Sequence, residues 1–406
     1  MKILVINTGS SSLKYQLFEM GAAKPYPLAS GLAERIGDSL GILTHKKDPG
    51  EATEKKLVKE TPLPDHATAL RLAMDLMTGS EAGVIKDASE IAAVGHRVVH
   101  GGEHFHDSTL ITDSVIEAIK HCVPLAPLHN PPNLTGILTA KAIFESTPQV
   151  AVFDTAFHQS MAPEVYLYAL PYECYADKGV RRYGFHGTSH WYVAKEAAAF
   201  LGKPLAEVNL ITLHLGNGSS ITAVKNGKSM DTSMGLTPLA GVIMGTRCGD
   251  IDPAIIFYLA RESGLSTDQL DDMLNKKSGF KGICGSNDLR DIHKRADEGD
   301  ARSKLALDMF AYRNKKYIGS YMAALGRVDA IVFTAGIGEN DTQARAATCA
   351  GLENMGVVMD PALNASPERG IRRISAEKSP VAVLVAPTNE ELEIANQTLA
   401  VLKKKG

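Results

Sequence analysis

The sequence predicts an α/β protein made of two similar halves, and three observations support this fold class. Short runs rich in β-branched residues alternate with segments of helical periodicity along most of the 406 residues. A hairpin pattern rich in glycine and serine occurs twice, at residues 3–18 and 210–224, with Ser11 of the first copy matching Ser219 of the second. No long Gly/Ser linker separates the halves, so we expect two lobes that pack closely and hinge.

The predicted strands and helices are interleaved throughout the chain. The segment 19–65 is polar and rich in Gly and Pro, and we expect an insertion that contains hairpin pieces. Strands are predicted at 2–6, 13–18, 91–99, 150–153, 210–215, 221–224, 330–334 and 381–386. Helices are predicted at 66–77, 132–144, 188–200, 252–261, 301–325 and 341–354.

The doubled hairpin is the most informative functional pattern. Each copy has an apolar β run, a small polar turn and a second β run. Small side chains, with glycines that tolerate unusual φ/ψ, allow backbone N–H groups to approach an anion closely. We therefore expect a phosphate loop in each half, with a nucleotide held between them.

A third candidate for nucleotide contact lies at 329–345. An apolar strand leads into the sequence Gly336-Ile337-Gly338-Glu339-Asn340, and a helix follows. Glycines at a strand-to-helix turn admit a ligand close to the backbone, and a helix N-terminus favours negative charge. A turn that merely requires glycine is the alternative; the two hairpins favour an adenosine or ribose contact. The chain has neither GxxxxGK(S/T) nor GxGxxG, which argues against a P-loop NTPase and against NAD.

The C-terminal segment separates a structural residue from a candidate ligand. Pro387 ends the strand 381–386, and Thr388 and Glu391 have the spacing of a capping box at the start of a helix. Capping would give Glu391 a structural role. It leaves Glu390 without one, so Glu390 becomes a candidate ligand.

Composition limits the class of partner and the compartment. The chain is 44% hydrophobic and 22% charged with a formal net charge of −3. This balance argues against a general nucleic-acid or membrane-surface binder. We expect a cytoplasmic protein without a membrane span, because no signal-peptide core and no 18-residue apolar window occurs. Five scattered cysteines without a CxxC pair fit reduced thiols in the core.

A cluster of histidines offers a rival metal site. His96, His100, His104 and His106 are close in sequence, and imidazoles at this density can bind Zn²⁺. The glycine pair at 101–102 breaks the strand and scatters the side-chain directions, and no HExxH pattern accompanies it. We therefore do not expect zinc here.

Ten sequence blocks closely resemble the acetate kinase (acetokinase) family, in family order from residue 3 to about residue 396. The resemblance implies the acetate and sugar kinase/Hsc70/actin superfamily, with a two-lobed, duplicated actin-like ATPase (ribonuclease H-like) fold and the nucleotide in the interlobe cleft. The N-terminal lobe would comprise 1–153 and 387–406, and the C-terminal lobe 154–386. The blocks are NTGSSSLKY, GHRVVHGG, PLAPLHNPPN, FDTAFH, RRYGFHGTSH, HLGNGSS, MDTSMGLTPLAG, MGTRCGDIDP, FTAGIGEN and PTNEE.

The reaction that the resemblance implies is reversible, Mg²⁺-dependent transfer of the γ-phosphoryl group of ATP to acetate, giving ADP and acetyl phosphate. Acetate is already ionised at neutral pH and needs little help from a base, whereas two anions must be brought together. A guanidinium can hold carboxylate or phosphoryl oxygens through two parallel hydrogen bonds. Arg97 and Arg247 lie in glycine-flanked, otherwise uncharged blocks. The resemblance implies that Arg97 binds substrate and that Arg247 stabilises the transition state.

Two further catalytic residues and two metal positions follow from the resemblance. His186 would donate to the transferring phosphoryl group; a core histidine bonded to backbone is the structural alternative. Asp154 ends the strand VAVFD, where an acidic residue is typical of an α/β site. Its role stays open between a base, an organiser of Mg²⁺ or its water, and a group that orients acetate through Arg97. Asn7 and Glu390 match the family's Mg²⁺ positions, with Mn²⁺ as the alternative ion.

The expected cosubstrate is ATP or ADP. Lys14 could reach a phosphate, although a solvated strand lysine is the alternative, and His214 is expected beside ATP in a positional role. His190 is expected to be structural. The other nucleotide contacts expected from the motifs are Leu215, Gly216, Asn217, Gly218, Gly336, Ile337, Gly338, Glu339 and Asn340. The resemblance adds Asp288, Leu289 and Arg290, where composition alone indicates a loop.

The resemblance places the methyl group of acetate in a small apolar pocket of Val99, Leu128, Phe185 and Pro238. Valine at position 99 leaves less room for a longer chain than a smaller residue would, so acetate is expected ahead of propionate.

Other functions in the same fold remain as alternatives. One is a propionate or butyrate kinase, and another is a sugar kinase, which would need a base Asp but not this group of Arg and His. A nucleotide-regulated chaperone or filament protein would need an added domain or a polymer interface, for which we expect no spare length. The resemblance implies a homodimer formed through the C-terminal lobe.

Overall fold

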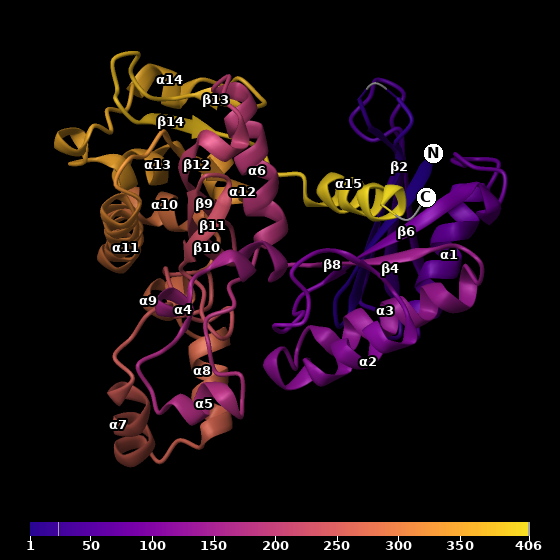
Figure 1. Cartoon of the computed structure of the whole chain (residues 1–406), viewed down its shortest axis with the longest axis horizontal. Helices are drawn as coiled ribbons and strands as arrows, with labels where there is room; N and C mark the ends of the chain where they lie inside the picture. The colour runs from indigo at the N-terminus through magenta and orange to yellow at the C-terminus, as the bar shows by residue number, and fades with distance from the viewer. Residues whose placement is uncertain (23, 405–406) are drawn as a thin grey trace. The chain divides into compact units, whose positions relative to one another are not determined.

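The computed structural model describes residues 1–22 and 24–404, which form two compact units. The first unit is Met1–Phe157 with Asn389–Gly406, and the second is His158–Thr388. Each unit is built on one mixed sheet with helices on both faces (Figure 1). Asp154 thus belongs to the same unit as Asn7, Arg97 and Glu390.

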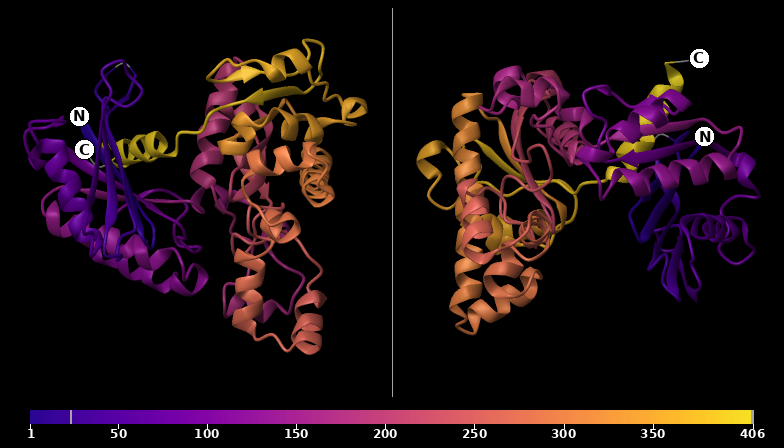
Figure 2. Two further views of the ribbon diagram at one scale, coloured as in Figure 1. Left: turned by 180° about the vertical axis from the view of Figure 1, so that it is seen from behind. Right: turned by 90° about the horizontal axis from the view of Figure 1, so that it is seen from below.

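The first unit has an eight-stranded sheet in the order β5-β4-β3-β2-β1-β6-β8-β7. Alternation of side chains divides its core between two faces. Leu4 and Ile6 of β1 pack with α1 and α3, whereas Ile3 and Val5 pack with Ile394 and its neighbours on α15. Both views in Figure 2 show α15, in yellow, against the strands of this unit. The elements are β1 Lys2–Thr8, β2 Ser12–Glu19, β3 Tyr26–Glu34, β4 Gly41–Lys47, β5 Lys55–Thr61, α1 His66–Thr78, β6 Ile91–Val98, β7 Thr109–Leu110, α2 Asp113–His121, α3 Asn130–Ile143, β8 Gln149–Phe153 and α15 Glu390–Lys403.

The second unit has a six-stranded sheet in the order β11-β10-β9-β12-β14-β13. Ile211 and Leu213 of β9 face the long helix α11, where they join the largest core cluster. The opposite face of β9 and β10 is polar and meets α6. The elements are α4 Pro163–Tyr166, α5 Tyr172–Ala176, α6 Gly187–Phe200, β9 Asn209–Leu215, β10 Ser219–Lys225, β11 Lys228–Thr232, α7 Ala254–Ser263, α8 Thr267–Lys276, α9 Gly279–Cys284, α10 Leu289–Asp297, α11 Ala301–Leu325, β12 Ala330–Thr334, α12 Ala335–Asn340, α13 Thr342–Cys349, α14 Pro361–Ala365, β13 Arg372–Arg373 and β14 Ala382–Val385.

The two sheets repeat one topology, which confirms the duplication predicted from the doubled hairpin. In the first unit, β3, β2 and β1 pair antiparallel, and β6 and β8 continue parallel to β1. In the second, β11, β10 and β9 pair antiparallel, and β12 and β14 continue parallel to β9. The first strand pair of each unit is the predicted hairpin, so the actin-like α/β architecture is present in both halves.

The glycines of the two hairpin turns serve a different purpose from the one predicted. Gly9, Gly216 and Gly218 do not adopt positive φ. Their lack of a side chain matters instead, because a Cβ on Gly9 would lie 2.7 Å from Ser12 Oγ and one on Gly218 would lie 3.4 Å from both Arg247 Nη1 and His186 Nε2. Glycine is therefore needed in these turns because neighbouring side chains approach the backbone closely, and not because the backbone adopts unusual φ angles.

Two other predicted elements are wrong in detail, and a third is confirmed in part. The segment 19–65 contains antiparallel hairpin strands, as predicted, but β3, β4 and β5 continue the first sheet in order. The helix predicted at 341–354 ends at Cys349, because Gly351 turns the chain at φ 80°. The N-cap of α15 is Asn389, whose side chain accepts the N–H of Leu392 at 3.0 Å. The capping role predicted for Thr388 and Glu391 is therefore wrong.

Among the described residues, no helix is both long enough and apolar enough to cross a bilayer.

Candidate active site

Arg97 is the centre of a charged cluster in the first unit. Strands β1, β6 and β8 are parallel neighbours, so their carboxyl ends bring Asn7, Arg97 and Asp154 to one edge of the sheet. Arg97 Nη2 donates to Asp154 Oδ2 at 2.5 Å, and Nη1 lies 3.4 Å from Asn7 Oδ1. The side chain of Asp154 is only 1% exposed, whereas that of Arg97 is 22% exposed. The buried carboxylate of Asp154 therefore fixes the guanidinium of Arg97, while part of the Arg97 side chain remains exposed to solvent.

Glu390 adds a second carboxylate to this cluster from the first turn of α15. Burial is the largest cause of a net rise of its pKa to about 7; Arg97 opposes this rise, and Asp154 adds to it. Burial alone would lower the pKa of Arg97, but Asp154 and Glu390 outweigh it and raise that pKa. Arg97 Nε is buried and has no hydrogen-bond partner among the described residues. A buried donor of this kind fits a site that accepts an anionic ligand.

The cluster also fits a hard divalent cation. Asn7 and Glu390 offer oxygen atoms, and a carboxylate that burial makes costly to ionise is stabilised by a cation. Among residues 1–22 and 24–404, no group of three or more His, Cys, Asp or Glu is placed to hold a metal. A metal at Asn7 and Glu390 would therefore take its other ligands from nucleotide phosphates and water.

Lys14 forms an ion pair with a carboxylate of the same unit. It lies opposite Asn7 in the first hairpin, and its ammonium forms an ion pair with Glu391. Half of the Lys14 side chain is exposed. Glu391, which the sequence assigned to a helix cap, instead holds this lysine beside the carboxyl ends of the strands.

The four residues expected around the acetate methyl group fall in both units. Val99 and Leu128 belong to the first unit, where Val99 is buried and Leu128 is 62% exposed. Phe185 and Pro238 belong to the second, where Phe185 is buried and Pro238 half-buried. The acyl pocket stays a prediction.

A histidine network covers the polar face of the second sheet. His186 caps α6 at φ 57°, and its Nδ1 lies 2.9 Å from Ser220 Oγ. Its ring stacks on that of His214 with centroids 4.2 Å apart, and His214 Nδ1 lies 2.8 Å from Ser189 Oγ. The left-handed backbone at His186 is a strained position for a residue other than glycine, as is common at functional sites.

His190 is a fully buried member of this network. Its two ring nitrogens lie 2.7 Å from Thr212 Oγ1 and 2.7 Å from Ser220 Oγ. Burial lowers the pKa of His190 well below its usual value, so the ring is neutral. The same Ser220 hydroxyl contacts His186 and His190, so His190 fixes the group that orients His186.

Arg247 approaches the second hairpin turn. Its Nη1 donates to the carbonyl of Pro238 at 3.1 Å, and burial lowers the pKa of the guanidinium. The turn residue Gly218 lies where a Cβ would come within 3.4 Å of both Arg247 Nη1 and His186 Nε2. A guanidinium nitrogen of Arg247 and an imidazole nitrogen of His186 thus converge beside the backbone of this turn; where both carry a proton, they can stabilise charge on a phosphoryl group.

The loop that carries Arg247 is held closed by residues that the sequence did not single out. Asp250 accepts the N–H of Gly241 at 2.7 Å, and its own N–H returns to the carbonyl of Gly241 at 2.8 Å. The hydroxyl of Tyr317 on α11 donates to the other carboxylate oxygen of Asp250. The only sequence signal was the Gly-Asp pair that follows Arg247, because the partner on α11 is remote in sequence.

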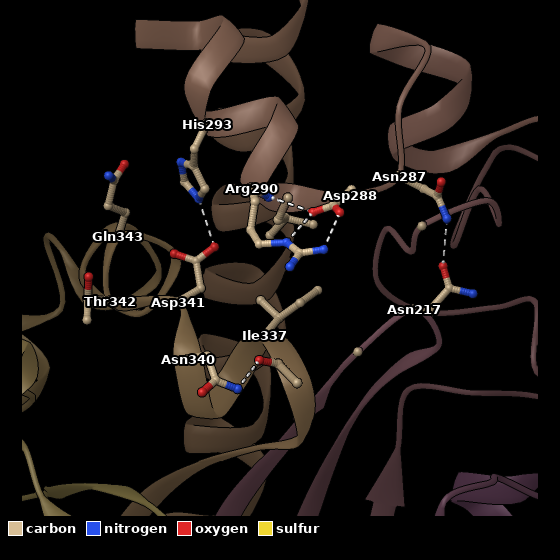
Figure 3. A pocket seen from close by; sticks show the side chains of 14 residues that line it. Asn217, Asn287, Asp288, Arg290, His293, Ile337, Asn340, Asp341, Thr342 and Gln343 are labelled. Carbon is tan, nitrogen blue, oxygen red and sulfur yellow. Dashed lines mark hydrogen bonds and ion pairs between the residues drawn. The ribbon is translucent and has the colours of Figure 1, made fainter. Parts of the chain in front are cut away.

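A pocket of about 890 Å³ opens in the second unit, within the size range of ligand sites (Figure 3). It is lined by three segments predicted to contact the nucleotide: the second hairpin turn, the start of α10, and α12. The predicted lining residues are Gly216, Asn217, Asp288, Leu289, Arg290, Gly336, Ile337 and Asn340. The lining residues that the sequence missed are Gly245, Asn287 and His293; Asp341, Thr342 and Gln343 lie in the predicted segment 329–345 but were not singled out.

Hydrogen bonds fix the walls of this pocket. Asp288 caps α10 and holds the guanidinium of Arg290 at 3.0 and 2.6 Å (Figure 3). His293 Nε2 lies 2.7 Å from Asp341, whose other oxygen caps α13. Gly336 has no atom within 4 Å of where its Cβ would be, so its missing side chain leaves open space beside the backbone.

The remaining predicted nucleotide residues lie outside the lining of this pocket. Leu215 is fully buried, and Gly338 is a buried residue of α12 that faces Phe333. Glu339 accepts the N–H of Ala335 at 3.0 Å and the N–H of Thr388 at 3.2 Å, and burial raises its pKa. Glu339 therefore ties α12 to the end of the second unit. His214 and Gly218 belong to the histidine and arginine group instead.

The second unit's pocket and donor pair, and the first unit's arginine–carboxylate cluster, are the features of a nucleotide-dependent phosphotransferase. A profile of the Acetokinase family matches residues 2–396. The chain is 56% identical over 403 residues to a protein named acetate kinase from Nitratidesulfovibrio vulgaris (strain DP4), covering 99% of this chain and 100% of that one. The chain therefore belongs to the acetokinase family.

Solved structures agree with this assignment. Porphyromonas gingivalis acetate kinase superposes with a TM-score of 0.93 at 45% identity, covering 99% of both chains. A propionate kinase from Francisella tularensis subsp. tularensis SCHU S4 superposes with a TM-score of 0.91 at 43% identity, covering 98% of this chain and 99% of that one.

Proposed function

We propose that this protein is an acetate kinase that transfers the γ-phosphoryl group of ATP reversibly to acetate, giving acetyl phosphate and ADP. The observation that carries the proposal is the pocket in which three distant segments, each predicted to contact a nucleotide, line one cavity. The full-length similarity to proteins named acetate kinase supports acetate as the acceptor.

Arg97 binds the carboxylate of acetate in this proposal. Its Nε is buried without a hydrogen-bond partner among the described residues, and Asp154 holds Nη2 from the other side. Asp154 then acts as the group that orients Arg97 rather than as a base, because acetate is already ionised at neutral pH. The 2.5 Å contact supports orientation of acetate through Arg97 among the roles that the sequence left open.

Arg247 and His186 stabilise the charge on the transferring phosphoryl group. Both present a nitrogen to the backbone of Gly218, and Ser220 and His214 fix the plane of the His186 ring. Donors held in place before the reaction stabilise a transition state without further reorganisation. The nucleotide occupies the pocket formed by the second hairpin turn, α10 and α12.

Mg²⁺ is the proposed metal, held by Asn7 and Glu390 with Mn²⁺ as the alternative ion. When bound, such an ion neutralises charge on the nucleotide phosphates. Every cysteine among the described residues is a free thiol, which fits a protein that acts in the cytoplasm. A homodimer formed through the second unit remains part of the proposal.

Propionate is the second candidate acceptor, because a propionate kinase is similar over nearly the full length. Buried Val99 favours the shorter acid. One methylene changes the free energy of binding in an apolar pocket by about 1–3 kcal/mol, so a preference rather than exclusion is expected.

Trapping with hydroxylamine tests the proposed function. Purified protein is incubated with MgATP, hydroxylamine and one of acetate, propionate, butyrate or glycerol, and acyl hydroxamate and ADP are measured. Acetate should give acetohydroxamate in proportion to ADP, and glycerol should give neither above the no-acceptor control. ADP release without hydroxamate from any carboxylate would show that the protein is not a carboxylate kinase.

A further inference from the structure

The pairing between β1 and β6 stops just where the charged cluster begins. The last paired residues of this parallel ladder are Ile6 and His96, and Asn7 and Arg97 follow on the two strands. If the same register continued, the N–H of Val99 would donate to the carbonyl of Thr8. That hydrogen bond is not made directly.

The side chain of Asn133 on α3 lies between the N–H of Val99 and the carbonyl of Thr8 and bonds to both. The N–H of Val99 donates to Asn133 Oδ1 at 3.0 Å, and Asn133 Nδ2 donates to the carbonyl of Thr8 at 2.8 Å. The carboxamide has the same N–H donor and C=O acceptor as a peptide group. It therefore bridges the two strands with two hydrogen bonds in place of one direct backbone hydrogen bond. Asn133 is 3% exposed. Its two bonds satisfy the N–H of Val99 and the carbonyl of Thr8, which would otherwise be unpaired and cost free energy on burial.

The backbone of α3 comes close enough for this contact because of Gly136. A Cβ at Gly136 would lie 2.1 Å from Thr8 Oγ1. One helical turn thus presents a glycine that admits Thr8 and an asparagine that binds its carbonyl. Both features allow α3 to pack closely against the end of β1, the strand that carries Asn7.

We propose that Asn133 is a positioning residue for phosphoryl transfer, because its carboxamide sets the separation of β1 and β6 at Asn7 and Arg97. A direct ladder bond would hold the two backbones about 2.9 Å apart from N to O. The inserted amide widens that gap one residue beyond Asn7 and Arg97, whose side chains approach each other with Nη1 at 3.4 Å from Asn7 Oδ1. This inference rests on the proposed function.

A matched residue on the same helix allows a structural role to be separated from a positioning role. Asn130 is also buried, and its amide binds the N–H and carbonyl of His100 and the carbonyl of Ile119. It bridges no pair of strands. Loss of either amide should lower the melting temperature, but only loss of Asn133 should move Arg97 relative to Asn7.

The experiment compares Asn133→Ala, Asn133→Asp and Asn130→Ala in kcat and in KM for acetate and for ATP, with thermal melting as the measure of folding. Aspartate keeps the shape and the acceptor toward Val99 but lacks the donor toward Thr8. Both Asn133 variants should lower kcat/KM for acetate by about 10- to 100-fold and leave KM for ATP within about twofold. Asn130→Ala should change kcat/KM for acetate by less than about threefold at a similar melting temperature.

A double-mutant cycle with Arg97→Lys makes the test specific. If Asn133 acts through Arg97, the loss caused by Asn133→Ala should be much smaller in the Arg97→Lys background, whereas the small effect of Asn130→Ala should multiply. Folded Asn133 variants with wild-type acetate kinetics, or an undiminished loss in the Arg97→Lys background, would overturn the inference. If Asn133→Ala does not fold, Asn133→Asp decides alone. Wild-type protein that forms no acyl phosphate would instead remove the proposed function, and this inference with it.

Discussion

Removal of Arg97 is the perturbation that the charged cluster predicts in most detail. Arg97→Ala deletes the buried Nε donor and both Nη groups, and it takes the guanidinium away from a carboxylate that is 1% exposed. Arg97→Lys keeps a positive charge near Asp154 but lacks the planar fork. The two variants therefore separate the loss of charge from the loss of two-point binding.

The expected magnitude follows from the bonds that Arg97 can form with a carboxylate. A hydrogen bond to a charged group contributes about 1.5–3 kcal/mol, so two such bonds contribute about 3–6 kcal/mol. Since about 1.4 kcal/mol corresponds to a factor of ten, kcat/KM for acetate should fall by about 10²- to 10⁴-fold in Arg97→Ala. Arg97→Lys can keep one of the two bonds and should fall by about 10- to 100-fold. Arg97→Ala should also lower the melting temperature, because Asp154 loses its buried cation.

The assay is the initial rate of acyl phosphate formation with acetate and with ATP varied in turn. KM for ATP should stay within about twofold, since the nucleotide pocket is lined by residues of the other unit. Guanidinium ion added to Arg97→Ala should restore part of the rate, and methylammonium should restore less. Acetate kinetics close to wild type in both variants, or a selective loss of ATP affinity, would refute the role given to Arg97.

Three further predictions concern the acceptor acid, the buried side chain of His96 and the loop that carries Arg247. Val99→Ala should lower KM for propionate relative to acetate, and an unchanged ratio of kcat/KM values would remove Val99 from the acyl pocket. Burial lowers the pKa of His96 to about 4, so the unfolded chain binds a proton that the folded chain does not; stability should fall as the pH drops from about 6.5 to 4, by about 2 kcal/mol at pH 5. Urea unfolding at pH 7.5 and pH 5 should show a smaller decrease for His96→Asn, and equal decreases would contradict the assignment. Tyr317→Phe removes the bond to Asp250 that holds the Arg247 loop, so kcat should fall about 3- to 30-fold with both KM values nearly unchanged, and a normal kcat would exclude this support.

The parts of the fold and site that the sequence predicted are those encoded in short stretches. Both hairpins can be read from a few small residues between apolar β runs, and their repetition indicated the duplicated sheets. The pocket residues Gly216, Asn217, Gly336, Ile337 and Asn340 could also be found locally, because they lie at glycine-rich turns next to a strand, whereas residues 288–290 were found through the family resemblance.

The supporting residues could not be found in this way, because their partners are far away in the chain. Asn133 and Thr8 are 125 residues apart, and Tyr317 and Asp250 are 67 apart. Local capping rules also failed at α15, where Asn389 took the position that spacing assigned to Thr388. Glu391 then became a partner of Lys14, a pairing that depends on α15 lying against the first sheet.

The most direct test of acetate as the acceptor is the specificity of the wild-type protein toward a series of acids. kcat/KM should be measured with saturating MgATP for acetate, propionate and butyrate in one assay of acyl phosphate formation. We predict that acetate has the highest value, that propionate is lower by about 10- to 100-fold, and that butyrate is lower again. A higher value for propionate or butyrate than for acetate would contradict the proposed function.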